Sequence, residues 1–164
     1  MSGQLLPFPW FDLVLILALI ALNGVLAMSE LAIVSAREAR LRALANSGNA
    51  GARCALGLAA DPGRFLSTVQ VGITMIGIIA GAYSGASLGE PVAQRIALLG
   101  VEPELASTIG FAVVIVLVTY ASLVIGELVP KQFALRSPEP IAAIVARPLV
   151  WLSKLTAPFV WLLD

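Results

Sequence analysis

Three apolar runs, each about as long as a bilayer is thick, limit what this chain can fold into more than any other feature. They cover about residues 10–35, 65–87 and 106–126. A helix needs about 20 predominantly apolar residues to cross the hydrocarbon core of a membrane. The chain is 59% hydrophobic and 12% charged, whereas an average soluble domain has about 25% charged residues. The sequence therefore predicts an all-α membrane protein with three transmembrane helices.

The segments outside these runs predict helices at the membrane surface. After the first run, Ala, Leu and Arg recur at helical spacing until "DPG" breaks the pattern, which we interpret as two short cytoplasmic juxtamembrane helices. Between the second and third runs we expect a short loop with one helical piece. Residues 137–164 contain too much proline to span, and we expect Pro148 and Pro158 to divide them. Three residues of this tail are typical of an interfacial helix: Trp151, Lys154 and Trp161.

The basic residues predict the orientation. Five arginines follow the first run: Arg37, Arg40, Arg42, Arg53 and Arg64. Only Arg95 follows the second run, and the tail after the third is again basic. Because Lys and Arg concentrate on the cytoplasmic side, we expect the N-terminus outside and the C-terminus in the cytoplasm. This predicts a multi-pass protein of the inner (plasma) membrane, in contact with the lipid bilayer.

Composition excludes several kinds of chemistry. The chain has no histidine and one cysteine, Cys54, which excludes an intrachain disulfide, a Cys/His zinc site and a histidine-dependent nucleophile. No Ser–Lys pair lies inside the predicted membrane segments, so an intramembrane hydrolase is disfavoured and we predict no enzyme. The formal net charge is zero, which gives no indication of a nucleic-acid partner.

Polar residues inside the spans are the candidate functional groups. Asn23 and Glu30 are seven residues apart and share a helix face; Asn23 can instead tie two helices together, and Glu30 can instead be an ion-pair partner of Arg37 or Arg64. The second run carries Ser67, Thr68, Gln70 and Thr74 in its cytoplasmic half. Its overlapping GxxxG steps allow another helix to approach closely and are consistent with a homodimer: Gly77, Gly81 and Gly85.

The stretch "VIGELVPKQF" ends the third run with Glu127 and Pro130. An acid at membrane depth is costly and marks a functional site by default. Pro130 lacks an N–H, so we expect a helix break that frees the carbonyl of Gly126. With Asn23 and Ser67, this gives an all-oxygen ligand set, which suits Mg²⁺, Ca²⁺ or Na⁺. Four further residues are candidate ligands: Thr68, Ser122, Gln70 and Glu30.

Three stretches, "NGVLAMSELAIVSAREARLRAL", "FLSTVQVGITMIGIIAGAYSG" and "YASLVIGELVPKQFALRSPEPIA", together resemble the transmembrane domain of the CorC/CNNM family of magnesium transporters. The resemblance implies three membrane helices, a homodimer and cytoplasmic nucleotide-binding CBS domains that lie outside this chain. It also implies a cytoplasm-facing cavity that holds dehydrated Mg²⁺, with efflux coupled to Na⁺ entry. An alternative function is a Mg²⁺-binding sensor or scaffold that regulates a partner transporter.

The family pattern also assigns roles to residues of this chain. The acid of its Gly-Glu-(Leu/Ile)-Val-Pro motif falls on Glu127, the polar position early in the first span falls on Asn23, and the early hydroxyls of the second span fall on Ser67 and Thr68. The chain departs from the pattern at Ile73, where animal relatives have an asparagine. Asn23 is therefore the candidate to supply an amide ligand.

Overall fold

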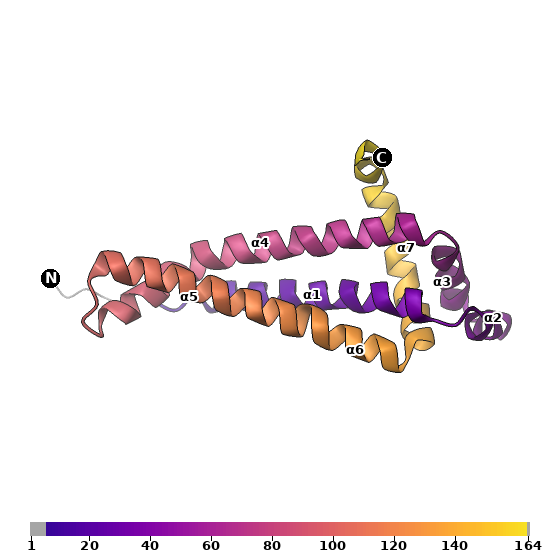
Figure 1. The fold of residues 1–164 in the computed structure, drawn as a ribbon, viewed down its shortest axis with the longest axis horizontal. Coiled ribbons are helices and arrows are strands. Elements are labelled where there is room, and N and C mark those ends of the chain that lie inside the picture. The colour runs from indigo at the N-terminus through magenta and orange to yellow at the C-terminus, as the bar shows by residue number, and fades with distance from the viewer. Residues whose placement is uncertain (1–5, 164) are drawn as a thin grey trace.

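The computed structural model describes the backbone of residues 6–163 and the side chains of these residues except Arg64 and residues 153–163. Every regular element in this part of the chain is helical (Figure 1), which confirms the all-α class. The elements are α1 (Trp10–Ser35), α2 (Glu38–Asn46), α3 (Ala50–Ala60), α4 (Pro62–Ala97), α5 (Pro103–Leu123), the π-helical turn η1 (Val124–Leu128), α6 (Val129–Arg136) and α7 (Pro138–Leu163).

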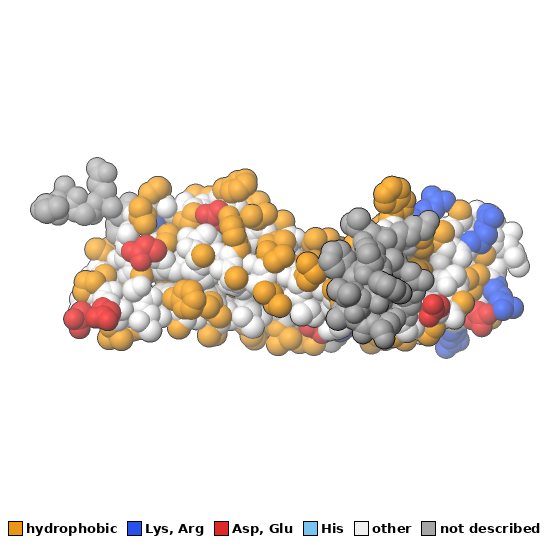
Figure 2. All heavy atoms as spheres, turned by 90° about the horizontal axis from the view of Figure 1, so that it is seen from above, with side chains coloured by type: hydrophobic (Ala, Val, Ile, Leu, Met, Phe, Trp, Pro, Cys, Tyr) orange, Lys and Arg blue, Asp and Glu red, His pale blue; other side chains and the backbone are white. Residues whose placement is uncertain are grey.

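Three rods run side by side along the length of the molecule: α1, α4, and the continuous series α5–η1–α6 (Figure 1). Each contains a segment long and apolar enough to cross a membrane, namely Trp10–Ser35, Phe65–Ala97 and Pro103–Arg136. The three predicted spans are thus confirmed, the first with the predicted bounds. Large hydrophobic side chains are exposed along the rods (Figure 2). A soluble monomer rarely exposes so large an apolar surface, whereas lipid would cover it.

The helix that contains the second predicted span extends beyond it. α4 continues past residue 87 and through Pro91 to Ala97, so the expected loop is mostly helix. α4 packs closely against α5 at this point. The two backbones are so near that a Cβ added at Gly110 of α5 would lie 2.7 Å from the Ala93 nitrogen. The Arg95 guanidinium also donates to the Pro91 carbonyl at 2.6 Å. Tertiary contacts therefore keep a helix in place where proline alone favours an end.

At the end of the bundle away from the N-terminus, α7 crosses the rods, beside α2 and α3 (Figure 1). α7 is a single helix through both prolines, so the prediction that Pro148 and Pro158 divide the tail was wrong. Its buried face holds it in place: Ala142, Ala146 and Leu149 pack in the same core as Ile33 of α1 and several residues of α3. The predicted interfacial side chains of Lys154 and Trp161 lie outside the described residues, and Trp151 is exposed.

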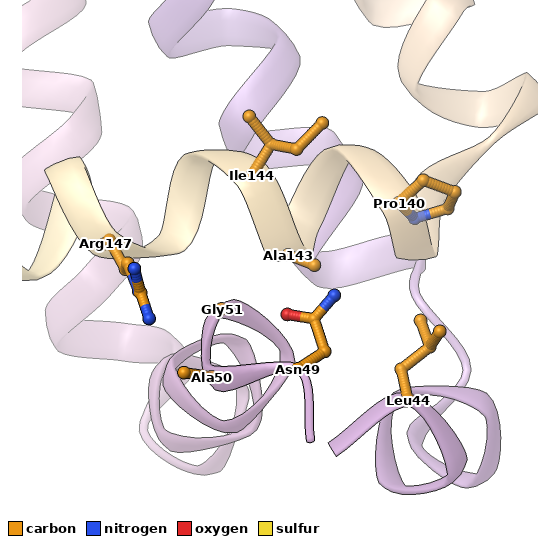
Figure 3. A pocket seen from close by; sticks show the side chains of 8 residues that line it. All are labelled: Leu44, Asn49, Ala50, Gly51, Pro140, Ala143, Ile144 and Arg147. Atoms are coloured by element: carbon orange, nitrogen blue, oxygen red, sulfur yellow. The ribbon is translucent and has the colours of Figure 1, made fainter. Parts of the chain in front are cut away.

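The same end of the molecule is basic. Lys and Arg side chains gather there (Figure 2), and we call this end, formed by α2, α3 and α7, the basic end. Glu139 at the start of α7 is buried, lies 3.7 Å from the Arg40 guanidinium and accepts a hydrogen bond from the Arg37 backbone N–H at 3.4 Å. An open groove of about 450 Å³ lies between α2, α3 and α7 (Figure 3), lined by Leu44, Asn49, Ala50, Gly51, Pro140, Ala143, Ile144 and Arg147.

Candidate cation site

The third rod contains a π-helical turn where a helix break was predicted. Residues Val124–Leu128 form this turn, and the chain continues without interruption into α6. The predicted break at Pro130 is therefore wrong. A π turn is wider than an α turn and carries i→i+5 hydrogen bonds, so it gives room for a proline ring that would otherwise clash with the carbonyl four residues earlier. The N–H of Val129 correspondingly bonds the Val124 carbonyl.

The Gly126 carbonyl, whose usual i+4 donor Pro130 removes, accepts a hydrogen bond from another helix. The Asn23 Nδ2 of α1 donates to it at 3.1 Å, in a buried position. Glycines on both sides allow this approach. A Cβ on Gly24 would lie 3.0 Å from Pro130 Cγ and 3.3 Å from the Ile125 carbonyl oxygen. Sequence and packing thus join α1 to the π turn at one point.

This hydrogen bond leaves the other polar atom of Asn23 unpartnered. Asn23 is 4% exposed, and its Oδ1 is the one buried side-chain N or O atom without a hydrogen-bond partner among the residues that the structure describes. Asn23 also lines a cavity of about 290 Å³ together with Ile73, Gly77, Ala80, Gly81, Val118, Thr119, Ser122, Leu123 and Glu127. An unpaired buried oxygen costs about 1–3 kcal/mol, which a cation in this cavity would recover.

The π turn explains why Thr119, Ser122 and Glu127 border the same cavity. In a regular α-helix, residues advance by 100° each, so Ser122 and Glu127 would lie about 140° apart around the axis. The π turn absorbs one extra residue, which reduces the angle between Ser122 and Glu127 to about 40°. The angle between Thr119 and Glu127 falls from about 80° to about 20° in the same way. Two hydroxyls and a carboxylate therefore lie on one side of the third rod.

Lys131 completes the charged part of the site. Its Nζ lies 2.9 Å from Glu127 Oε1, one helical turn away, and 3.7 Å from Glu30 Oε2 on α1. Glu30 was expected to pair with Arg37 or Arg64. Among the described side chains its ion-pair partner is Lys131, and the Arg64 alternative lies outside the described residues. Asn23 and Glu30 share a face, as predicted, and both meet the η1–α6 part of the third rod.

Not every predicted ligand lies at this cavity. Asn23, Ser122 and Glu127 line it, but Ser67, Thr68 and Gln70 of α4 do not. Ser67 and Gln70 are exposed, and Thr68 is 2% exposed in the core. The departure noted at Ile73 does fall on the cavity, which places an aliphatic side chain among its polar groups.

The three glycines of the GxxxG steps in α4 have different surroundings. A Cβ on Gly85 would lie 2.7 Å from Phe111 Cε2 of the same chain, whereas a Cβ on Gly77 or Gly81 would meet nothing within 4 Å. Gly77 and Gly81 instead border the cavity. Gly85 thus serves packing between α4 and α5, while the other two keep space open.

The donor set of the site is poor in anions. The described residues hold no group of three or more His, Cys, Asp and Glu side chains that could bind a metal. At the cavity, one carboxylate stands with neutral amide and hydroxyl oxygens. Hard cations accept such ligands.

Comparison with known proteins agrees with this picture. A family model described as "CNNM: Cyclin M transmembrane N-terminal domain" matches residues 14–164. The UPF0053 protein sll0260 of Synechocystis is 45% identical over 93% of the chain and 34% of that protein. The UPF0053 protein YhdT of Bacillus subtilis is 36% identical over 93% of the chain and 33% of that protein. A polyamine export protein of Haemophilus influenzae is 31% identical over 91% of the chain and 34% of that protein.

The fold and the cavity define a multi-pass α-helical membrane protein with a polar site between its helices. The chain belongs to the CNNM transmembrane-domain family, which confirms the resemblance drawn from "GELVPK" and its companion stretches. This is a transporter-type family rather than a catalytic one. The chain spans about a third of the length of the curated relatives it matches.

Proposed function

We propose that this domain carries Mg²⁺ across the membrane, as an efflux transporter driven by Na⁺ entry. The observation that carries the proposal is the buried, unpartnered Oδ1 of Asn23 at a cavity that Glu127 also lines. A residue with an unpartnered oxygen acceptor and a carboxylate on the lining of the same cavity are suited to a hard cation. They are poorly suited to an anion or an apolar ligand.

The composition of the cavity favours a small divalent ion. Mg²⁺ prefers oxygen ligands in octahedral geometry and usually keeps several waters. A cavity of about 290 Å³ has room for an ion with part of its water shell, because a water molecule takes about 30 Å³. Asn23, Ser122, Thr119 and Glu127 would supply oxygens, with Glu127 as the anion. Na⁺ accepts the same oxygens, so entry of one ion can displace the other.

The orientation and assembly belong to the same proposal. The basic end would face the cytoplasm by the positive-inside rule, which puts the N-terminus outside an inner (plasma) membrane. α7, which crosses the rods (Figure 1), would lie in the headgroup layer. In the whole protein we expect a homodimer and a cytoplasmic CBS domain.

The test is flux through purified protein in liposomes. We expect an Na⁺ gradient to drive Mg²⁺ movement, read by a trapped Mg²⁺ indicator. Glu127→Gln should abolish Mg²⁺ binding and flux while leaving a folded protein, and Glu30→Gln should weaken transport less. Glu104→Gln is a matched control, because Glu104 lies in the first turn of α5, far along the same rod. Tight Mg²⁺ binding by Glu127→Gln, measured by calorimetry, would place the site elsewhere.

Two other functions are separated by the same experiment. The Lys131 ammonium lies 2.9 Å from Glu127 and 3.7 Å from Glu30, so both carboxylates already pair with an alkylammonium group of this chain. One relative is named a polyamine export protein, so an organic polyamine is the second candidate substrate. Flux of 1,4-diaminobutane without Mg²⁺ flux would favour it. Mg²⁺ binding without flux of either ion would favour a sensor or scaffold.

A further inference from the structure

The ion pair between α1 and α6 is not explained by cation transport alone. Lys131 Nζ lies 2.9 Å from Glu127 Oε1 and 3.7 Å from Glu30 Oε2. The Lys131 and Glu30 side chains are 31% and 20% exposed. One ammonium thus stands between the carboxylate of the cavity and a second carboxylate that does not line it.

We propose that Lys131 is a built-in competitor of the transported cation. It neutralises Glu127 when the cavity is empty, and it transfers to Glu30 when a cation binds Glu127. The proposal rests on the proposed function, because it needs a cation that takes Glu127 as a ligand. It gives Glu30 a role as the acceptor of the displaced ammonium.

The geometry makes this transfer short. The ammonium is in hydrogen-bond contact with Glu127 and already lies within ion-pair distance of Glu30. Lysine has a flexible four-carbon stem and three donors, and it acts as a mobile point charge. A change of side-chain torsions is therefore enough to exchange the partners, with no movement of the backbone.

The two carboxylates exceed Lys131 by one negative charge. This excess attracts a cation to Glu127, and Glu30 keeps the displaced ammonium from facing the bound cation without a counter-charge. During release the ammonium returns to Glu127, which prevents the carboxylate from holding the ion. Binding and release of the cation are thus coupled to one side chain.

If the Lys131 ion pair only holds α1 and α6 together, removal of Lys131 has the opposite effect on cation affinity. Removing a tie loosens the site and lowers cation affinity. Removing a competitor leaves Glu127 without a partner and raises affinity. Lys131→Met, which keeps most of the volume of the side chain, therefore distinguishes the two.

The experiment is Mg²⁺ titration of purified protein by calorimetry, with size-exclusion chromatography to verify folding. Lys131→Met should bind Mg²⁺ about tenfold more tightly than the parent, in the middle of the range for coupled neighbouring charges. Lys131→Arg keeps the positive charge, so its Mg²⁺ affinity should lie closer to that of the parent than the affinity of Lys131→Met does. Arg136→Gln is the matched control, because it removes a positive charge from the last turn of the same helix. If Lys131→Met fails to fold, Lys131→Gln replaces it.

A double-mutant cycle tests the role of Glu30. In the parent, Glu30→Gln should weaken Mg²⁺ binding, because the displaced Lys131 ammonium then has no second carboxylate to pair with. In Lys131→Met, the same substitution should have little effect on Mg²⁺ binding. An equal loss in both backgrounds would make Glu30 a general attractive charge and overturn the exchange. Unchanged or weaker binding by Lys131→Met, or an equal gain by Arg136→Gln, would also overturn it while leaving the proposed function standing. A parent protein that binds no Mg²⁺ would overturn both.

Discussion

Replacing Asn23 by leucine tests whether this residue is a cation ligand or only joins α1 to the third rod by a hydrogen bond. The substitution keeps the approximate volume and removes both polar atoms of the side chain. It removes a hydrogen bond to the Gly126 carbonyl, 3.1 Å long, and leaves that carbonyl without this donor, a cost of about 1–3 kcal/mol. It also removes the buried and unpartnered Oδ1, a gain of similar size. Side-chain hydrogen bonds inside membrane proteins average only about 0.6 kcal/mol.

These terms nearly cancel, so Asn23→Leu should change the free energy of unfolding by less than about 1 kcal/mol. Cation binding should respond differently. An interaction of a polar group with a charge contributes about 1.5–3 kcal/mol, which corresponds to a loss of about tenfold to a hundredfold in Mg²⁺ affinity. The two effects are therefore separable in one experiment.

The assay is thermal unfolding in detergent with and without Mg²⁺. A ligand that binds only the folded state stabilises it by RT ln(1 + [L]/Kd), so Tm rises with the logarithm of the ratio of ligand concentration to Kd. The parent should show this rise, and Asn23→Leu should start from a similar Tm and show little rise. Ser29→Ala is the control on the same helix, because the buried Ser29 hydroxyl donates within α1 to the Val25 carbonyl. A variant that is clearly less stable but keeps the full Mg²⁺ response would show that Asn23 is only a tie.

Three further substitutions test other parts of the structure. Ile73→Asn adds an oxygen to the cavity lining and should tighten Mg²⁺ binding about tenfold by calorimetry; weaker binding would contradict the position of the cavity. Gly24→Val places a Cβ 3.0 Å from Pro130 Cγ, so it should move α1 away from η1 and weaken Mg²⁺ binding. An unchanged Mg²⁺ affinity would argue against this contact. Glu139→Gln removes a buried charge and should lower stability by about 1–2 kcal/mol in thermal unfolding, whereas the exposed Glu38→Gln should cost less than about 0.5 kcal/mol.

The membrane helices were predictable because apolar length is a local property. The first span was predicted with its observed bounds, since polar residues and a change of pattern follow it directly. The helices that contain the second and third predicted spans continue past residues 87 and 126, to Ala97 and Arg136. Both continuations run through prolines. Pro91 and Pro130 signal an end in the sequence, but packing at Gly110 and the π turn at Val124–Leu128 accommodate them.

The site was predictable in part for the same reason. Asn23 and Glu127 stand out as polar residues at membrane depth, and both line the cavity. Thr119 also lines the cavity but was not among the predicted ligands, and the π turn that brings it, Ser122 and Glu127 to one side is not visible in composition. Lys131 was counted only as a basic residue of the tail. Its spacing of four from Glu127 is a recognised ion-pair spacing on helices and was the available signal.

The balance of charge at this site is more consistent with a transported cation than with a permanently bound structural one. A structural metal is held by several anionic ligands, and the described residues contain no such cluster. Here the cavity has one carboxylate, and that carboxylate already has Lys131 at 2.9 Å. In the exchange proposed above, a cation displaces the ammonium to bind, and the ammonium returns on release. Both states of that exchange would leave Glu127 with a positive partner, so neither would require a bare carboxylate at membrane depth, which is costly.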